Sequence, residues 1–354
     1  MSAQPPSALL DVAAKVNERL DQFLEQQSTE WSGVDPRLAE AIEQLRSIVA
    51  RGGKRIRAAF CYWAWQGSTG SDSADTSVVI DVGAALELLQ AFALIHDDIM
   101  DDSVTRRGQP TIHVTQAQRL TSEGWRGEPR RFGEGVAILI GDLSHAFADK
   151  LMADSGPAAR LIWDDLRIEL NLGQYLDLRS AASGQLDLET ARQVSTFKSA
   201  LYTIVRPLQL GSSLGRAADP ELLAVLEGYG RPLGQAFQLR DDLLGIVGDE
   251  ILLGKPVGDD LREGKPTELL SLAVERATPE EARVLDQVGQ RDLSTAEIKA
   301  IVEVFVATDA ISDIEARIDR LVVEAVSIIP RLPFTDMAKE ALGDLADYVA
   351  ARNS

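Results

Sequence analysis

The segment over residues 82–95 (VGAALELLQAFALI) constrains the fold most strongly, because it is long, apolar and followed at once by an acidic run. It contains no proline and a single glycine near its start. Strands usually contain about 4–8 residues, so an apolar run of this length favours a buried helix. We expect this helix to continue through the acidic run (HDDIMDD) until Gly108-Gln109-Pro110 stops it.

Helical patterns recur along the chain, whereas alternating runs with hairpin turns are scarce. Residues 165–177 and 222–247 predict further apolar helices. Thr278 and Ser294 are each followed three residues later by a glutamate, the pattern of a helix N-terminus. We expect loops over residues 67–76, 124–135 and 248–264. The sequence therefore predicts an all-α fold of ten or more helices in a single domain, residues 1–354, with residues 1–35 as a peripheral N-terminal helix and connector.

Composition excludes several classes of protein. The 354 residues include 36 Lys and Arg against 55 Asp and Glu, a formal net charge of −19. This acidity argues against binding to nucleic acid or, through basic residues, to anionic membranes. A single cysteine, Cys61, excludes an intramolecular disulfide and a multi-cysteine zinc site. The N-terminus does not resemble a signal peptide, and no run reaches the roughly 18 apolar residues of a membrane span, so we expect a cytoplasmic protein with no integral membrane segment.

The acidic run contains a candidate metal site. Asp97 and Asp101 stand at i and i+4, so their carboxylates lie on one face of a helix, with Asp98 beside them. Like charges at this spacing destabilise a helix, and a bound cation compensates for that cost. Oxygen ligands favour Mg²⁺, which takes one or two carboxylates and completes its shell with water and substrate phosphate. Taken alone, the run is equally well explained as a solvated acidic helix end.

Two basic clusters are conspicuous in so acidic a chain. Arg106-Arg107 follows the acidic run, and residues 51–57 (RGGKRIR) combine two glycines with three cations in four residues. Guanidinium groups bind phosphate well, and glycine lets a backbone approach it closely. Either cluster alone is more simply explained as surface decoration.

A second carboxylate pair, Asp241-Asp242, ends another apolar helix about 140 residues further on. Segments with glycine and lysine follow it, at Gly254-Lys255 and Gly264-Lys265. Two acidic helix ends of this kind predict two metal-binding sides facing one anionic ligand, such as a diphosphate held through Mg²⁺. A zinc site does not fit, because no His or Cys has ligand spacing.

At these residues the chain resembles the trans-prenyl diphosphate synthases, the polyprenyl synthetase family, and most closely its bacterial short-chain geranylgeranyl and farnesyl members. The resemblance rests on residues 87–98 (ELLQAFALIHDD), on RRGQP after them and on the downstream FQLRDD. It implies a large helical bundle of the isoprenoid synthase type, with a central cavity between two Asp-rich helices. It also implies Mg²⁺-dependent condensation of isopentenyl diphosphate with allylic diphosphates, three Mg²⁺ ions per site and a homodimer.

The resemblance further assigns roles to single residues. The metal ligands would be Asp97, Asp98, Asp101, Asp241 and Asp242. The allylic diphosphate would contact Arg106, Lys198 and Lys255. The diphosphate of isopentenyl diphosphate would be held by Lys54, Arg57 and Arg107. The substrate site would be completed by Gln90, Gln174, Gln238 and Lys265.

Two departures from the family pattern bear on activity. Gly245 stands where the second motif normally has a third aspartate, and we expect Asp249 or Asp259 to substitute in part and activity to survive. Gln90 stands where histidine is frequent, which keeps a hydrogen-bond donor without its charge and predicts weaker binding of isopentenyl diphosphate. The histidines His96, His113 and His145 need no catalytic role.

Phe92 and Ala93 bear on product length. They precede Asp97 by about one helical turn, roughly 6–7.5 Å. In the family, an aromatic residue at the fifth place before the motif, a small one at the fourth and no insertion between the aspartates resemble the geranylgeranyl (C20) type. Ordinary core packing is the alternative role of Phe92.

Three alternatives stay open: farnesyl diphosphate as the main product, a class I terpene cyclase and a non-catalytic partner subunit. The cluster at Lys54 favours a synthase over a cyclase. Gly245 is the main support for a partner subunit.

Overall fold

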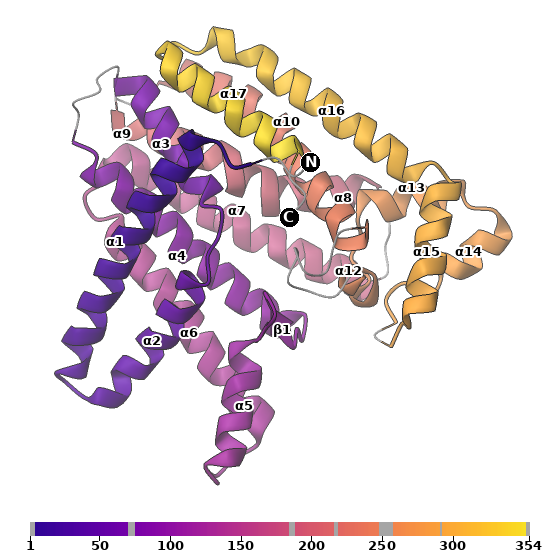
Figure 1. Ribbon diagram of the computed structural model, residues 1–354, viewed down its shortest axis with the longest axis horizontal. Helices are drawn as coiled ribbons and strands as arrows, with labels where there is room; N and C mark the ends of the chain where they lie inside the picture. Colours follow the sequence, from indigo (N-terminus) through magenta and orange to yellow (C-terminus); the bar gives the residue numbers. More distant parts are fainter. Residues whose placement is uncertain are drawn as a thin grey trace. The chain divides into compact units, whose positions relative to one another are not determined.

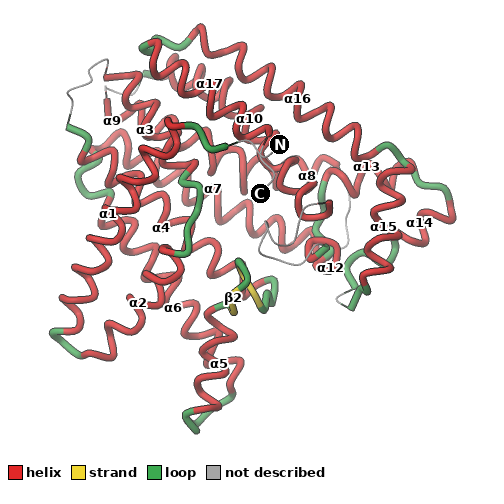
Figure 2. The backbone as a smooth tube through the Cα atoms, viewed as in Figure 1, coloured by secondary structure: helices red, strands yellow, loops and turns green. Residues whose placement is uncertain are grey.

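The structure is a computed structural model that describes residues 4–69, 75–183, 188–215, 219–247, 258–290 and 292–351. Within these ranges the backbone is almost entirely helical, and the only strands form one short antiparallel pair (Figure 2). The predicted all-α fold is confirmed.

The chain divides into two compact units (Figure 1). The N-terminal unit comprises Pro6–Arg160 and Leu210–Ala217, and the C-terminal unit comprises Leu161–Gln209 and Ala218–Ser354 together with the first five residues. That the whole chain acts as a single domain stays a prediction.

The N-terminal unit contains α1 (Ser7–Ser32), α2 (Pro36–Ala50), α3 (Ile56–Thr69), α4 (Ser77–Met100), β1 (Thr105–Arg106), β2 (Gln109–Pro110), α5 (Ile112–Ser122) and α6 (Pro129–Leu151). Two further helices begin in one unit and end in the other, α7 (Gly156–Ser183) and α9 (Arg206–Gly215). The C-terminal unit contains α8 (Leu188–Ser195), the π-helix η1 (Thr196–Val205), α10 (Pro220–Val247), α12 (Asp259–Glu263), α13 (Glu268–Arg276), α14 (Pro279–Leu285), α15 (Thr295–Ala307), α16 (Ala310–Ile328), the 3₁₀ turn η2 (Ile329–Arg331) and α17 (Asp336–Ala351).

Helix α4 is the core helix of the N-terminal unit, and it packs against α1, α3 and α6. Gly83 allows this close packing, since a Cβ there would lie 3.1 Å from Val16 and 3.2 Å from Ala58. By length and composition α4 passes as a membrane span, but 67% of its most apolar window is buried in the protein. Its apolar character is therefore that of a core helix.

The helix predicted within the first 35 residues is α1. Its apolar residues recur at helical spacing, and Leu9, Val12, Val16 and Leu20 are at most 2% exposed. This stripe packs against α2, α3 and α4. Burial of each such side chain contributes about 1.5–3 kcal/mol to the free energy of unfolding. Packing of α1 therefore stabilises α4, the helix that carries the first acidic motif.

Helix α10 is the corresponding element of the C-terminal unit, where it packs against η1, α16 and α17. Tyr229 of α10 is fully buried and donates its hydroxyl to the carbonyl oxygen of Leu342 in α17, at 2.8 Å. Gly234 faces η1 at a point where any Cβ would collide with Ala200. These contacts hold α10, whose C-terminal part carries the second acidic motif, against its neighbours in this unit.

Two element ends differ from the sequence-based expectation. Helix α4 stops at Met100 and not near Gly108, because Asp102 adopts a left-handed conformation with φ of 58° and the chain enters the β1–β2 hairpin. The loop expected over residues 124–135 is shorter, because α6 begins at Pro129. Glu128 caps that helix by accepting hydrogen bonds from the N–H groups of Arg130 and Arg131.

Other local predictions are confirmed. Thr278 and Ser294 each form a capping box with the glutamate three residues later, at the starts of α14 and α15. The apolar segments over 165–177 and 222–247 lie within α7 and α10. Of the expected loops over 67–76 and 248–264, residues 70–74 and 248–257 lie outside the described residues, and α12 occupies Asp259–Glu263.

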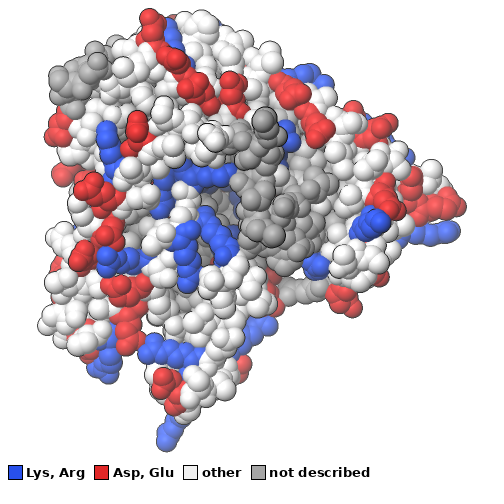
Figure 3. All heavy atoms as spheres, in the orientation of Figure 1, with Lys and Arg blue, Asp and Glu red and all other residues white. Residues whose placement is uncertain are grey.

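The surface reflects the composition. Acidic side chains form broken rows over α16 and α17, and Lys and Arg side chains gather in groups of their own on the same face (Figure 3). The described structure thus agrees with an acidic chain in which a minority of cations is grouped locally.

Candidate functional site

The first acidic motif lies at the C-terminal end of α4. Asp101 is the C-cap residue, and its N–H donates to the carbonyl oxygen of Asp97 at 2.8 Å, so the two residues remain one turn apart although the helix ends earlier than expected. Asp98 is buried and 7% exposed. Its Oδ1 accepts a hydrogen bond from Nε of Arg106 at 2.6 Å, and Nη2 of Arg106 lies 3.5 Å from Oδ2 of Asp97.

Burial raises the pKa of Asp98 from 3.8 to about 6, against the opposing effect of Arg106. The neighbouring charges of Asp97 and Asp101 raise it further. A buried carboxylate of this kind favours any additional cation, because a cation offsets the cost of desolvating its charge. Three hard oxygen donors beside one arginine therefore fit Mg²⁺ and a phosphate group.

The hairpin after α4 positions both arginines of the RRGQP segment. Thr105 pairs with Pro110 and Arg106 with Gln109. The two turn residues, Arg107 and Gly108, have φ of 53° and 70°, as a two-residue hairpin turn requires. The hairpin thereby directs the guanidinium of Arg106 back to Asp98. The pKa of Arg107 is lowered by burial and by the positive charges of Arg106 and Arg55.

The basic cluster predicted between α2 and α3 adjoins this hairpin. A Cβ on Gly53 would lie 3.3 Å from Nη1 of Arg55 and 3.7 Å from Nη2 of Arg107. Lys54 and Arg57, on the loop and in the first turn of α3, are half-buried, and so is Gln90 of α4. The structure thus brings the loop and the hairpin, two of the elements assigned to isopentenyl diphosphate, together within the N-terminal unit.

The second acidic motif lies near the end of α10 and is held by a chain of hydrogen bonds. Ser199 of η1 donates to Oε1 of Gln238, and Nε2 of Gln238 donates to Oδ1 of Asp242 at 2.7 Å. Gln238 therefore orients Asp242, and its lining of the substrate site stays a prediction. Burial raises the pKa of Asp242 from 3.8 to about 7, and the hydrogen bond from Gln238 opposes that shift.

The missing third carboxylate is replaced in space by Asp260. A Cβ on Gly245 would collide with the Asp260 carboxylate, which also raises the pKa of Asp242. The N–H of Gly258 donates to the carbonyl oxygen of Gly245 at 3.0 Å and brings this segment to α10. Asp259, the residue expected to substitute in part, pairs instead with Arg262 at 2.8 Å, and its role at the metal site stays a prediction.

Asp260 is the functional candidate that the sequence analysis missed. The adjacent Asp259-Asp260 pair was the available signal, but only the fold distinguishes its two members. Lys265 lies 3.3 Å from Oδ1 of Asp260 and 2.6 Å from Oε2 of Glu263, so it joins this acidic group. Asp249 and Lys255 lie outside the described residues.

Lys198 is carried by the π-helix η1, a rare element that is frequent at functional sites. Its Nζ lies 2.7 Å from Oδ2 of Asp177 in α7. Gly173 allows this approach, since a Cβ there would lie 2.9 Å from the backbone nitrogen of Lys198. Gln174, the next residue of α7, is half-buried. The lysine is thus held by a carboxylate of its own unit.

The residues assigned to product length lie on α4. Phe92 is half-buried, and its ring lies 4.6 Å from the ring of His96 and 4.9 Å from that of His145. Ala93 is also half-buried. Both histidines therefore have ring contacts with Phe92, and their lack of a catalytic role stays a prediction.

Among the described ranges, no group of three or more Asp, Glu, His or Cys side chains is preassembled as a metal site. Magnesium does not require such a cage, because it is bound by one or two carboxylates together with phosphate and water. The Asp98 and Asp242 sites, each a desolvated carboxylate with a second carboxylate beside it, fit that mode of binding.

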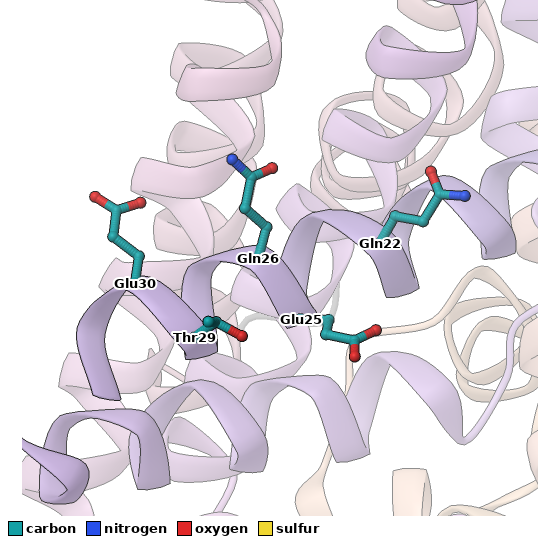
Figure 4. A pocket seen from close by; sticks show the side chains of 5 residues that line it. All are labelled: Gln22, Glu25, Gln26, Thr29 and Glu30. Atoms are coloured by element: carbon teal, nitrogen blue, oxygen red, sulfur yellow. The ribbon is translucent and has the colours of Figure 1, made fainter. Parts of the chain in front are cut away.

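A surface pocket on α1 is unrelated to these groups. It is lined by five exposed side chains of that one helix, Gln22, Glu25, Gln26, Thr29 and Glu30 (Figure 4). No cation lines it, so it does not suit an anionic substrate.

Comparisons with known proteins agree with this geometry. The family model described as polyprenyl synthetase matches residues 38–305. The short chain isoprenyl diphosphate synthase of Methanothermobacter thermautotrophicus is 32% identical, over 97% of this chain and 98% of that protein. The geranylfarnesyl diphosphate synthase of Aeropyrum pernix is 31% identical, over 86% of this chain and 92% of that protein.

A solved structure shows the same fold. The geranylgeranyl pyrophosphate synthase of Corynebacterium glutamicum, complexed with isoprenyl diphosphate and magnesium, superposes with a TM-score of 0.92. It is 37% identical, and the match covers 97% of this chain and 99% of that one.

Proposed function

Because this chain belongs to the polyprenyl synthetase family, and is a prenyltransferase that makes prenyl diphosphates, we propose that geranylgeranyl diphosphate is its main product. The substrates are isopentenyl diphosphate and allylic diphosphates of C5 to C15. The observation that supports condensation of two diphosphate substrates is a neighbouring pair of groups in the N-terminal unit: acidic side chains with Arg106, and the loop at Gly53 with Arg107 of the hairpin.

The first site holds the allylic diphosphate. Asp97, Asp98 and Asp101 are the Mg²⁺ ligands of the N-terminal unit, Asp241, Asp242 and Asp260 are the candidate Mg²⁺ ligands of the C-terminal unit, and the enzyme uses three ions. Bound Mg²⁺ neutralises the charge that develops on the diphosphate as the allylic C–O bond breaks. Arg106 is the direct diphosphate contact of the N-terminal unit, Lys198 and Lys265 are the candidate diphosphate-binding cations of the C-terminal unit, and Lys255 keeps its predicted role of contacting the allylic diphosphate.

The second site holds isopentenyl diphosphate without metal. Lys54, Arg57 and Arg107 pair with its diphosphate, and Gln90 adds a neutral hydrogen-bond donor. The double bond of isopentenyl diphosphate attacks the allylic carbon, the C–O bond to the first diphosphate breaks, and a proton lost from the adduct completes the head-to-tail product. The released diphosphate takes up that proton, so no protein base is needed.

Phe92 limits the length of the product. Its ring packs against the rings of His96 and His145, about one helical turn before Asp97. These contacts support the proposal, because they hold a bulky side chain in place on the N-terminal side of the first motif. Related proteins make products of different lengths, including a geranylfarnesyl diphosphate synthase, so length depends on the residues of this chain. Farnesyl diphosphate is the alternative product.

We also propose a cytoplasmic homodimer. Four apolar residues of α7 are 58–69% exposed and recur along one helix face, Leu161, Ile168, Leu172 and Tyr175. A second copy of this chain would cover that stripe. Leu172→Glu should then shift the mass measured by light scattering from dimer to monomer, whereas Val323→Glu, at a 70% exposed residue of α16, should not.

Incubation with Mg²⁺, isopentenyl diphosphate and each of the C5, C10 and C15 primers tests the proposal. The expected result is condensation with a C20 end product. A cyclic hydrocarbon would indicate a class I terpene cyclase. No condensation with any primer would indicate a non-catalytic partner subunit.

A further inference from the structure

Arg55 belongs to the basic segment but is directed into the protein. It is buried, with 6% exposed, and its guanidinium makes three hydrogen bonds. Nε donates to Oδ1 of Asn17 in α1, Nη1 to Oε2 of Glu87 in α4, and Nη2 to the carbonyl oxygen of Val49, each at 2.8 Å. A guanidinium engaged in this way is not available as a phosphate ligand.

Glu87 is the buried partner, with 5% exposed. Among the described residues its Oε1 accepts no hydrogen bond, and its Oε2 lies 3.8 Å from the point where a Cβ on Gly53 would stand. Nη1 of Arg55 and Nη2 of Arg107 lie 3.3 and 3.7 Å from the same point, so the Glu87 carboxylate, which is ion-paired with Arg55, is in the neighbourhood of both guanidinium groups. Its charge raises the pKa of Arg107, against the larger lowering effects of burial, Arg106 and Arg55.

The backbone of this loop is fixed at the same place. Gly52 and Arg55 have φ of 90° and 53°, and a left-handed non-glycine residue persists where its surroundings hold it there. The three hydrogen bonds of Arg55 provide that restraint. Lys54 precedes it and Arg57 follows in the first turn of α3, so the anchor also fixes their backbone.

We propose that Arg55 and Glu87 are positioning residues that hold Lys54, Arg57 and Arg107 in the arrangement that binds isopentenyl diphosphate. This inference rests on the function proposed above for those three cations. Glu87 itself cannot bind a diphosphate, since it is a carboxylate. Its effect on binding is therefore exerted through Arg55 and Arg107.

The test is calorimetric titration of the full-length protein with isopentenyl diphosphate in EDTA, so that the Mg²⁺ sites do not contribute. Glu87→Gln should weaken binding by about 10–100-fold, the size typical of losing a group that orients ligands. Simple removal of a negative charge near an anion site would instead strengthen binding. Arg55→Lys keeps the positive charge but cannot make all three hydrogen bonds, so it should also bind isopentenyl diphosphate more weakly than the wild type.

Steady-state kinetics provide a second readout. In both variants KM for isopentenyl diphosphate should rise by more than either kcat or KM for the allylic primer changes. Arg19→Gln is the control, because it breaks a part-buried ion pair between α1 and α4, with Asp81, that includes neither Arg55 nor Glu87. This control should bind isopentenyl diphosphate like the wild type.

Folding is checked by circular dichroism and thermal melting. If the single variants do not fold, Arg55→Met with Glu87→Leu removes both charges together and avoids an unpaired buried charge. Unchanged or tighter binding in folded Glu87→Gln, or wild-type affinity in Arg55→Lys, would overturn the positioning role. Absence of binding by the wild type would refute the proposed substrate site itself, together with this inference.

Discussion

Nε of Arg106 lies 2.6 Å from Oδ1 of Asp98, so the first acidic motif is tied to the hairpin that follows it. A carboxylate and a guanidinium are thereby placed side by side, the pair of groups that a Mg²⁺-diphosphate needs. The same contact shows that Asp98 is a buried residue with a structural partner as well as a proposed metal ligand.

Loss of a metal ligand from the first motif should abolish most activity. Asp97→Asn is the cleanest substitution, because Asp97 is only half-buried, and we expect turnover to fall by about 100-fold or more. Asp98→Asn should lower turnover similarly, because it removes the other proposed metal ligand at this end of α4. Asp102→Asn is the control, because asparagine tolerates the left-handed conformation of Asp102. Near-normal turnover in Asp97→Asn would contradict the metal role.

Asp260 should act as the third carboxylate of the second motif. Asp260→Asn should raise the Mg²⁺ concentration needed for half-maximal activity by about tenfold, because one ligand or water-bridged acceptor is lost. Asp259→Asn is a matched control at the adjacent position, where the carboxylate pairs with Arg262. Equal Mg²⁺ requirements of the two variants would rule out a specific role of Asp260.

The raised pKa of Asp242 predicts a pH-dependent stability of the metal-free protein. The folded-state pKa of Asp242, about 7, lies above the ordinary 3.8. The contribution of its protonated form to the free energy of unfolding is therefore fully present below about pH 4 and is lost as pH rises through 7. Between pH 5 and 8 the melting temperature of the wild type should therefore fall by roughly several degrees more than that of Asp242→Asn. Calorimetric melts of both proteins in EDTA provide the measurement. Parallel pH profiles would show that Asp242 is ionised throughout.

Phe92 should set product length. Phe92→Ala should give products longer than those of the wild type, because the ring that packs against His96 and His145 is removed. Phe92→Tyr keeps the bulk and should keep the wild-type product. Chromatography of the dephosphorylated products distinguishes the two. An unchanged distribution in Phe92→Ala would leave Phe92 as a core residue only.

Features that depend on local sequence were predictable. The i, i+4 relation of Asp97 and Asp101 and the capping boxes at Thr278 and Ser294 depend on helical spacing alone, and the structure shows all three. The end of α4 was not predictable, because it follows from the left-handed turn at Asp102 and the hairpin beyond it.

Features that depend on contacts between distant segments were missed. Asp260 was not distinguished from Asp259, because its place beside α10 depends on the approach of Gly258 to Gly245. Arg55 was grouped with its basic neighbours because its inward direction depends on Asn17 and Glu87 in two other helices. Only the tertiary structure contains this information.

The most direct test of the central claim is the stoichiometry of the reaction with farnesyl diphosphate, isopentenyl diphosphate and Mg²⁺. Head-to-tail condensation predicts one diphosphate released for each isopentenyl diphosphate consumed, with geranylgeranyl diphosphate accumulating and no reaction in EDTA. Release of diphosphate from the allylic substrate without consumption of isopentenyl diphosphate would contradict it.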